Sequence, residues 1–138
     1  MPANQSKKMT AATMGDGVHN PLDFTEFHPD EGNVVIMYAD DPDSNIVIWN
    51  LEPGQENSTH VHPASTHIQV VLQGHGTYMK DGKEVQVKKG DAIIIPRGVV
   101  HGIRNTGNER LSYMAVTSGE SYDRQPVGEQ KVSIGDGH

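Results

Sequence analysis

Four histidines in this chain stand at spacings that allow them to bind one metal ion: His60, His62, His67 and His101. Residues two apart on a β-strand point to the same face, so a strand through residues 60–62 would present two imidazoles to one point. Strands that start near His67 and near His101 can each add a nitrogen if the sheet closes around that point. Imidazole nitrogens at roughly 2.0–2.2 Å suit manganese, iron, nickel, copper, cobalt or zinc. We therefore predict one divalent transition metal ion per chain.

Two spaced motifs surround these histidines. The first runs from Gly54 through three of the histidines to Gly74, and the second comprises Gly90, Pro96, Gly98, His101 and Asn105. Together they resemble the paired motifs of the cupin superfamily, except that His67 stands where many cupins carry a glutamate ligand. The chain thus resembles the small single-domain cupins that have four histidine ligands. The resemblance implies a cupin-like β-barrel, a metal centre built from the four histidines, and a homodimer.

The ligand types narrow the chemistry but do not choose the metal. Four neutral imidazoles leave the charge of a divalent ion uncompensated, so its open positions should attract water, hydroxide, an enolate or a carboxylate. An all-nitrogen set favours later or redox-active ions over those that prefer oxygen donors, without excluding manganese. The remaining histidines lie in turns or polar segments, and we predict no role for His19, His28, His75 or His138.

Short apolar runs separated by Gly, Pro, Asp and Asn predict an all-β fold, a single antiparallel β-barrel or jelly roll. Asp81 and Gly82 predict a hairpin turn because both residues tolerate positive φ. Pro96 ends a strand, and Gly98 permits a tight turn into the strand that carries His101. The other predicted strands cover residues 33–39, 45–51, 58–62, 67–73, 76–80, 84–87, 91–95 and 110–117.

Composition predicts one domain with polar ends. Residues 1–20 should form an N-terminal arm, residues 21–117 the cupin-like domain, and residues 118–138 a C-terminal tail. The net charge of −7, without a basic cluster beyond Lys7 and Lys8, argues against nucleic acid and anionic membranes as partners. The chain has no cysteine, no apolar stretch of membrane-spanning length and no signal-peptide pattern, so we expect a cytoplasmic protein that binds a small-molecule substrate.

Three residues are candidates for a substrate pocket. By strand parity Gln69 shares the face of His67, whereas Trp49 and Tyr113 match positions where similar four-histidine cupins place aromatic pocket residues. Each of the three would serve equally well as a buried core residue. No Asp or Glu falls at an inward position beside the histidines, so no carboxylate is predicted as a general acid or base, and no catalytic residue is assigned.

Three classes of function remain open on these grounds. The primary hypothesis is a mononuclear metal oxidoreductase, most simply a dioxygenase that acts on a small enol, diketone or electron-rich aromatic substrate. The second is a metal-dependent isomerase, cyclase or lyase that uses the ion only to polarise a carbonyl. The third is a cupin that binds a small molecule without turnover.

Overall fold

The computed structural model describes residues 8–40, 44–119 and 123–127. The outer part of the predicted N-terminal arm (1–7), residues 41–43 and most of the predicted C-terminal tail (120–122 and 128–138) lie outside the described residues. The elements along the chain are η2 (Pro21–Phe24), β1 (Asn33–Asp40), β2 (Ser44–Leu51), β3 (Glu56–Val61), β4 (Ser65–Gln73), β5 (His75–Lys80), β6 (Lys83–Lys88), β7 (Ala92–Ile95), β8 (His101–Arg104), β9 (Leu111–Gly119) and β10 (Gln125–Pro126).

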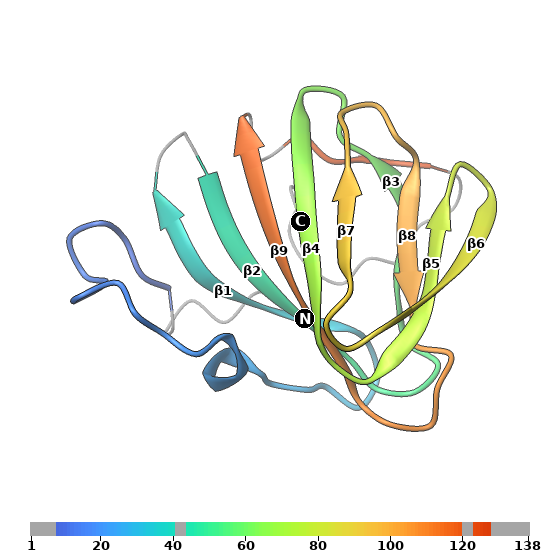
Figure 1. Cartoon of the computed structure of the whole chain (residues 1–138), viewed down its shortest axis with the longest axis horizontal. Coiled ribbons are helices and arrows are strands. Elements are labelled where there is room, and N and C mark those ends of the chain that lie inside the picture. The colour runs from blue at the N-terminus through green and yellow to red at the C-terminus, as the bar shows by residue number, and fades with distance from the viewer. Residues whose placement is uncertain (1–7, 41–43, 120–122, 128–138) are drawn as a thin grey trace.

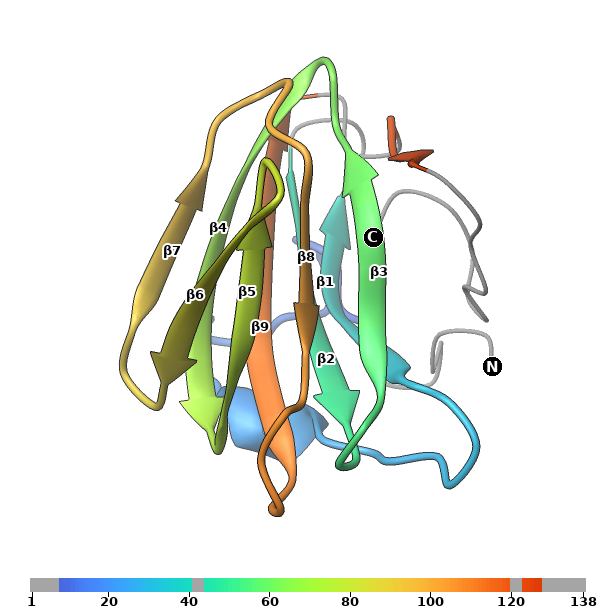
Figure 2. The same cartoon turned by 90° about the vertical axis from the view of Figure 1, so that its right-hand side faces the viewer.

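These strands form two antiparallel sheets that face each other (Figures 1 and 2). Sheet A has the order β1-β2-β9-β4-β7, and sheet B has the order β10-β3-β8-β5-β6. The chain crosses between the sheets repeatedly, so that β3 and β4, which are consecutive, lie in different sheets. The predicted all-β jelly roll is confirmed, but the two sheets do not close into a continuous barrel.

The local signals of the sequence agree with the strands that form. Each predicted strand overlaps one of β1 to β9, with ends that differ by at most two residues. Asp81 and Gly82 have φ angles of 47° and 83° and join β5 to β6, as predicted from their tolerance of positive φ. Gly98 has a φ of 84° and follows β7, which ends just before Pro96. The short helix η2 and the two-residue strand β10 were not predicted.

Apolar side chains fill the space between the sheets. On β2 and β9 the period of two turns Val47, Trp49, Tyr113 and Ala115 into this core. A second cluster of Phe24, Val35, Met37 and Ile48 covers the outer face of β1 and β2. The chain before β1 therefore packs back over sheet A, which explains why β1 is apolar on both faces. Within the described residues, no helix has the length and apolar character needed to cross a membrane.

The pair β3–β8 at the centre of sheet B positions the histidines. His60 lies directly opposite His101, and the register shifts between Asn57 and His60. At this irregularity β8 carries Gly102, where a Cβ atom would lie 2.9 Å from the backbone oxygen of Asn57 and 3.0 Å from the backbone nitrogen of Thr59. Because glycine has no Cβ, the two strands can approach closely where they present their histidines.

Candidate metal centre

Three of the four predicted ligands meet at one point. His60, His62 and His101 each offer a ring nitrogen, and these nitrogens lie within 4.8 Å of one another. The ring centroids of His60 and His101 are 4.3 Å apart, and those of His60 and His62 are 5.0 Å apart. The three residues are 0%, 2% and 1% exposed in the order of the chain. The end of β3 thus supplies His60, and His62 follows just after this strand, while the start of β8 supplies His101. The three side chains converge on one buried point.

Hydrogen bonds fix how each of the three rings is oriented. Nδ1 of His60 donates to the backbone oxygen of Ser58 at 2.6 Å, and Nδ1 of His101 donates to that of Val99 at 2.9 Å. Nδ1 of His62 donates to the carboxylate of Asp123 at 2.9 Å. Carbonyl and carboxylate oxygens only accept, so the ring hydrogen stands on Nδ1 and the lone pair on Nε2.

Whether these residues fit a metal ion depends on the surroundings of Nε2, the other nitrogen of each ring. Nε2 of His60, His62 and His101 is buried and has no hydrogen-bond partner among the described residues. Buried polar atoms are nearly always paired, so three convergent lone pairs without a donor call for an explanation. A transition metal ion supplies one, because metal-bound histidines characteristically donate the second ring N–H to a carbonyl or carboxylate. The three residues therefore fit a metal ion.

Burial keeps these imidazoles in the neutral form that binds metals. Burial lowers the pKa of His101 to about 4, and burial followed by the charge of His101 strongly lowers the pKa of His60. The pKa of His62 is also lowered by burial, although the hydrogen bond to Asp123 opposes the shift. At neutral pH the donor set carries no charge, so a divalent ion would not compete with bound protons.

His67 lies beside this triad but comes from the opposite sheet. It stands on β4 in sheet A, with its ring centroid 3.7 Å from that of His62 and 5.9 Å from that of His101. Its two ring nitrogens are 3.3 and 3.4 Å from the hydroxyl of Thr117. It groups instead with His62 and Asp123, whose ligand atoms also lie within 4.8 Å of its own. The four-ligand set therefore stays a prediction.

Asp123 is a residue of the site that the sequence analysis missed. Besides His62, its carboxylate accepts hydrogen bonds from the backbone nitrogen of Ala64 at 2.6 Å and the hydroxyl of Ser65 at 2.7 Å. Burial raises the pKa of Asp123, but the hydrogen bonds from Ser65, Ala64 and His62 outweigh it and lower the pKa overall. The expectation that no carboxylate lies beside the histidines is wrong. Asp123 is 61 residues from His62, so no local spacing could reveal it.

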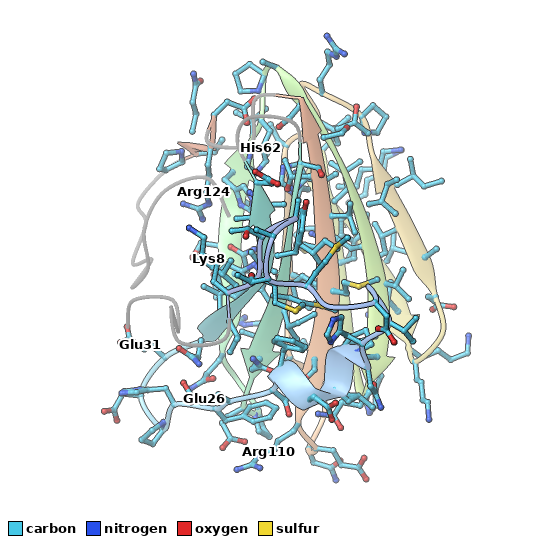
Figure 3. The ribbon with its side chains drawn as sticks, turned by 90° about the vertical axis from the view of Figure 1, so that its left-hand side faces the viewer. Lys8, Glu26, Glu31, His62, Arg110 and Arg124 are labelled. Atoms are coloured by element: carbon cyan, nitrogen blue, oxygen red, sulfur yellow. The ribbon has the colours of Figure 1, made fainter. Side chains whose placement is uncertain are left out.

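Arg124 is the second residue that sequence reasoning missed. It is 7% exposed, and its guanidinium donates to Oδ1 of Asn57 at 3.3 Å. Nδ2 of Asn57 in turn donates to the hydroxyl of Tyr113 at 3.1 Å. The charge of Arg124 is one of the smaller contributions to the lowered pKa of His60, of His62 and of His101. Figure 3 shows His62 and Arg124 toward one end of the molecule, and Arg110 at the other.

The three predicted pocket residues all point into the interior. Trp49 and Tyr113 stack with ring centroids 6.3 Å apart and an interplanar angle of 9°. Gln69 is buried on β4, two residues from His67, and its Oε1 has no hydrogen-bond partner among the described residues. Burial raises the pKa of Tyr113, so its hydroxyl stays protonated at neutral pH. Their role toward a substrate stays a prediction.

One groove of about 290 Å³ lies elsewhere, over β3, β5 and β8 in sheet B. Its lining includes Glu56, Thr77 and Arg104, and none of the four histidines borders it. Arg104 and Glu56 are partly exposed and form an ion pair there at 3.3 Å. This groove is therefore separate from the candidate metal centre.

The fold and the histidine triad define the class of protein. The family model for the cupin domain matches residues 47–117, half of the chain, and this segment contains all four predicted ligands. The chain belongs to the cupin family.

Particular cupins are similar to this chain over part of its length. The chain is 38% identical over 66 residues to an oxalate-binding protein of Thermotoga maritima. The matched segment covers 48% of this chain and 54% of that protein. It therefore spans about half the length of this relative. An uncharacterised Klebsiella pneumoniae protein with a double-stranded β-helix domain superposes with a TM-score of 0.74 and 26% identity, covering 81% of this chain and 97% of that one. A predicted oxalate decarboxylase from Thermotoga maritima has a TM-score of 0.53 and 33% identity, covering 54% and 65% of the two chains.

Proposed function

We propose that this chain is a mononuclear metal-dependent enzyme of the cupin family. His60, His62 and His101 hold one divalent transition metal ion, and His67 completes the set as a weaker fourth ligand. The observation that carries this proposal is the convergence of three buried Nε2 atoms that lack any hydrogen-bond partner among the described residues. When bound, such an ion supplies a Lewis acid and, if it is redox active, electrons for the activation of dioxygen.

The residues around the triad prepare it for that ion. Ser58, Val99 and Asp123 hold the Nδ1 hydrogens and so fix the three rings in the tautomer that a metal requires. Burial of the rings excludes bulk water from the point where they converge. Asp123 is ionised and engaged by three donors, which suits it to orienting His62 and not to moving a proton.

We propose that the reaction is oxidative, with a small enol, diketone or electron-rich aromatic compound as the substrate. The neutral all-nitrogen triad supports this choice, because it leaves a redox-active ion with open positions and no carboxylate ligand. Turnover of the substrate should then require dioxygen. Activity that persists under strict anaerobiosis would exclude a reaction that consumes dioxygen.

Two other functions have support from similar proteins. Likeness to a predicted oxalate decarboxylase favours a non-redox isomerase, cyclase or lyase reaction, in which the ion only polarises the substrate. Likeness to an oxalate-binding protein favours binding without turnover. Retained activity after zinc replaces the native metal would favour the first of these. Metal and ligand binding with no product from any substrate would favour the second.

The first experiment measures metal content by inductively coupled plasma mass spectrometry on untagged protein. We expect about one equivalent of a transition metal in the wild type and less than about a tenth of that in His101→Ala. His75→Ala is the matched control, because His75 is an exposed histidine at the start of β5 and lies outside the triad. It should keep the wild-type metal content. Equal metal in the wild type and His101→Ala would show that these histidines do not form the centre.

A further inference from the structure

A second groove, of about 340 Å³, lies where the edges of the two sheets meet. β6 is the edge strand of sheet B, and β7 is the edge strand of sheet A. Sheet B lines this β6–β7 groove with Tyr78, Lys80 and residues 85–87, and β7 with the turn before it adds residues 91–94. Within the described residues, none of the four predicted ligand histidines borders it. The β6–β7 groove is therefore separate from the candidate metal centre.

The wall that sheet B contributes is a part of the core face that lies open to solvent. Val85 stands directly opposite Tyr78 in the β5–β6 ladder, so both side chains point to the inner face of sheet B. Tyr78 is 5% exposed, whereas Val85 is 46% exposed beside the last strand of sheet A. Ile94, which borders the groove from β7, is 67% exposed. An apolar group in the groove would remove both side chains from water, which is favourable.

Tyr78 brings an unused hydrogen-bond donor to the same groove. Its hydroxyl is buried and has no hydrogen-bond partner among the described residues. Buried tyrosine hydroxyls usually find a partner, so this one calls for an explanation. Burial, and after it the charge of Asp81, raises the pKa of Tyr78, so the hydroxyl keeps its hydrogen at neutral pH. A ligand that carries an acceptor would supply the missing partner.

Lys80 gives one end of the groove a positive charge. It lies two residues after Tyr78 on β5, so its exposed side chain starts from the same face of the strand. Among the described residues, no carboxylate forms an ion pair with it. Asp91 lines the opposite end, but its carboxylate accepts a hydrogen bond from the backbone nitrogen of Lys88 at 2.9 Å and lies 3.6 Å from Nζ of Lys88. The free charge of the groove is therefore that of Lys80.

We propose that the β6–β7 groove is a binding site for a small amphipathic carboxylate, either a single-ring aromatic acid or a short-chain aliphatic acid. The apolar body of the ligand packs against Val85 and Ile94, and its carboxylate accepts a hydrogen bond from Tyr78 and pairs with Lys80. An apolar lining with a few polar groups is characteristic of small-molecule sites, and the volume of the groove is at the low end of their usual range. Binding here goes beyond the proposed metal-dependent function and does not depend on it.

The test titrates the isotope-labelled full chain with phenylacetate and hexanoate, and with the neutral amides of the two acids, and follows the backbone amide signals by nuclear magnetic resonance. We expect at least one acid to bind with a Kd below about 1 mM. Its amide should bind at least about tenfold more weakly, because a hydrogen bond to a charged group is stronger than a neutral one. The signals that move should belong to β6 and β7. Equal affinity for acid and amide, no binding of either acid, or shifts confined to other strands would overturn the proposal.

Two substitutions test the polar end of the groove. Lys80→Gln removes the charge from an exposed side chain, so it should weaken binding of the acid by about tenfold and leave the affinity of the amide unchanged. Tyr78→Phe removes a hydroxyl that has no partner, so it should weaken acid binding by about threefold or more without lowering the melting temperature. Lys89→Gln is the matched control, because Lys89 is exposed in the turn after β6 and does not line the groove. Wild-type acid affinity in either Lys80→Gln or Tyr78→Phe would overturn this assignment.

The metal content separates this site from the metal centre. The same titration is made on the chain loaded with one equivalent of zinc and on the metal-free chain, and we expect the same acid affinity in both. Failure of the chain to take up zinc would count against the proposed function alone, since the groove contains none of the predicted ligands. Acid binding that requires zinc would place the acid at the metal centre and overturn the proposal.

Discussion

The two ends of β8 use buried polar residues in opposite ways. His101 begins the strand and leaves Nε2 buried without a hydrogen-bond partner among the described residues. Asn105, just after its end, has its side-chain atoms fully engaged. Nδ2 of Asn105 donates to the backbone oxygens of Leu51 and Glu109, and its Oδ1 accepts from the backbone nitrogen of Gly107. One polar group is left open for a ligand, and the other closes the fold.

Both residues belong to the same sequence motif, so motif membership does not tell which of them carries chemistry. The difference lies in hydrogen-bond satisfaction, which only the structure reveals. A buried group with every partner in place stabilises the fold, whereas a convergent set of unpaired atoms indicates a candidate ligand site. We therefore expect substitutions at the two ends to separate stability from metal binding.

The largest expected change in stability comes from Asn105→Ala. Truncation removes one buried and two partly buried hydrogen bonds and leaves two carbonyls and one N–H without their partner. Each unsatisfied buried group costs about 1–3 kcal/mol, so the free energy of unfolding should fall by about 4 kcal/mol. Urea denaturation of the metal-free protein measures this change.

Asn108→Ala is the matched control for this substitution, because Asn108 lies in the same loop and is exposed. It should change the unfolding free energy by less than about 0.5 kcal/mol. The folded fraction of Asn105→Ala should still bind metal with wild-type stoichiometry. Loss of metal with little loss of stability would reverse the roles that we assign to the two ends of β8.

The next largest effect is expected from Gly102→Ala, which should lower both the free energy of unfolding and the affinity for metal. An added Cβ would meet backbone atoms of Asn57 and Thr59 at 2.9–3.1 Å, and backbone cannot move aside easily. We expect a loss of about 2 kcal/mol in unfolding free energy together with weaker metal binding, because β3 and β8 must separate where they carry His60 and His101.

Gly107→Ala is a useful control for that substitution. The three atoms nearest to a Cβ there all belong to the ring of His75, the nearest at 2.7 Å, and that exposed ring can rotate away. Thermal unfolding with and without zinc measures both variants. If Gly107→Ala proves as damaging as Gly102→Ala, the close approach of β3 and β8 is not what positions the triad.

Part of the fold and of the candidate site can be predicted from the sequence, and part cannot. The period-two strands and the turn at Asp81 follow from local spacing. The convergence of His60, His62 and His101 was predicted from two separate motifs, as part of a set of four histidines. Asp123 was missed because its contact with His62 depends on where the chain returns after β9, and that segment has no apolar periodicity to indicate a strand. β10 is only two residues long and contains a proline, which is unfavourable for strands except at edges.

The separation of His67 from the triad has a different cause. Parity correctly places its side chain inward, but its distance from the other ligands depends on how far sheet A stands from sheet B. No motif spacing encodes that distance. The sequence therefore identifies which residues face the centre, and the packing of the two sheets decides how closely each one approaches it.

Asp123→Asn should weaken metal binding and lose one of the hydrogen bonds that the carboxylate accepts. The amide keeps the size of the carboxylate but lacks its charge and offers only one accepting oxygen, so the ring of His62 is held less firmly. Loss of such a partner typically lowers metal affinity by about 10–100-fold. Competition with a chromophoric chelator for zinc gives the affinity. Asp91→Asn, which changes a carboxylate engaged with Lys88 away from the triad, should leave it unchanged.

The smallest effect on metal affinity is expected from His67→Ala, and it decides how many ligands the centre has. As a weaker fourth ligand from the other sheet, its loss should lower zinc affinity by about tenfold or less, whereas His101→Ala should abolish stoichiometric binding. The same chelator competition compares the two variants directly. A loss equal to that of His101→Ala would make His67 a full member of the centre and imply that the sheets move together when the ion binds. No change at all would leave a three-histidine centre, with His67 packed against His62 and its ring nitrogens next to the hydroxyl of Thr117.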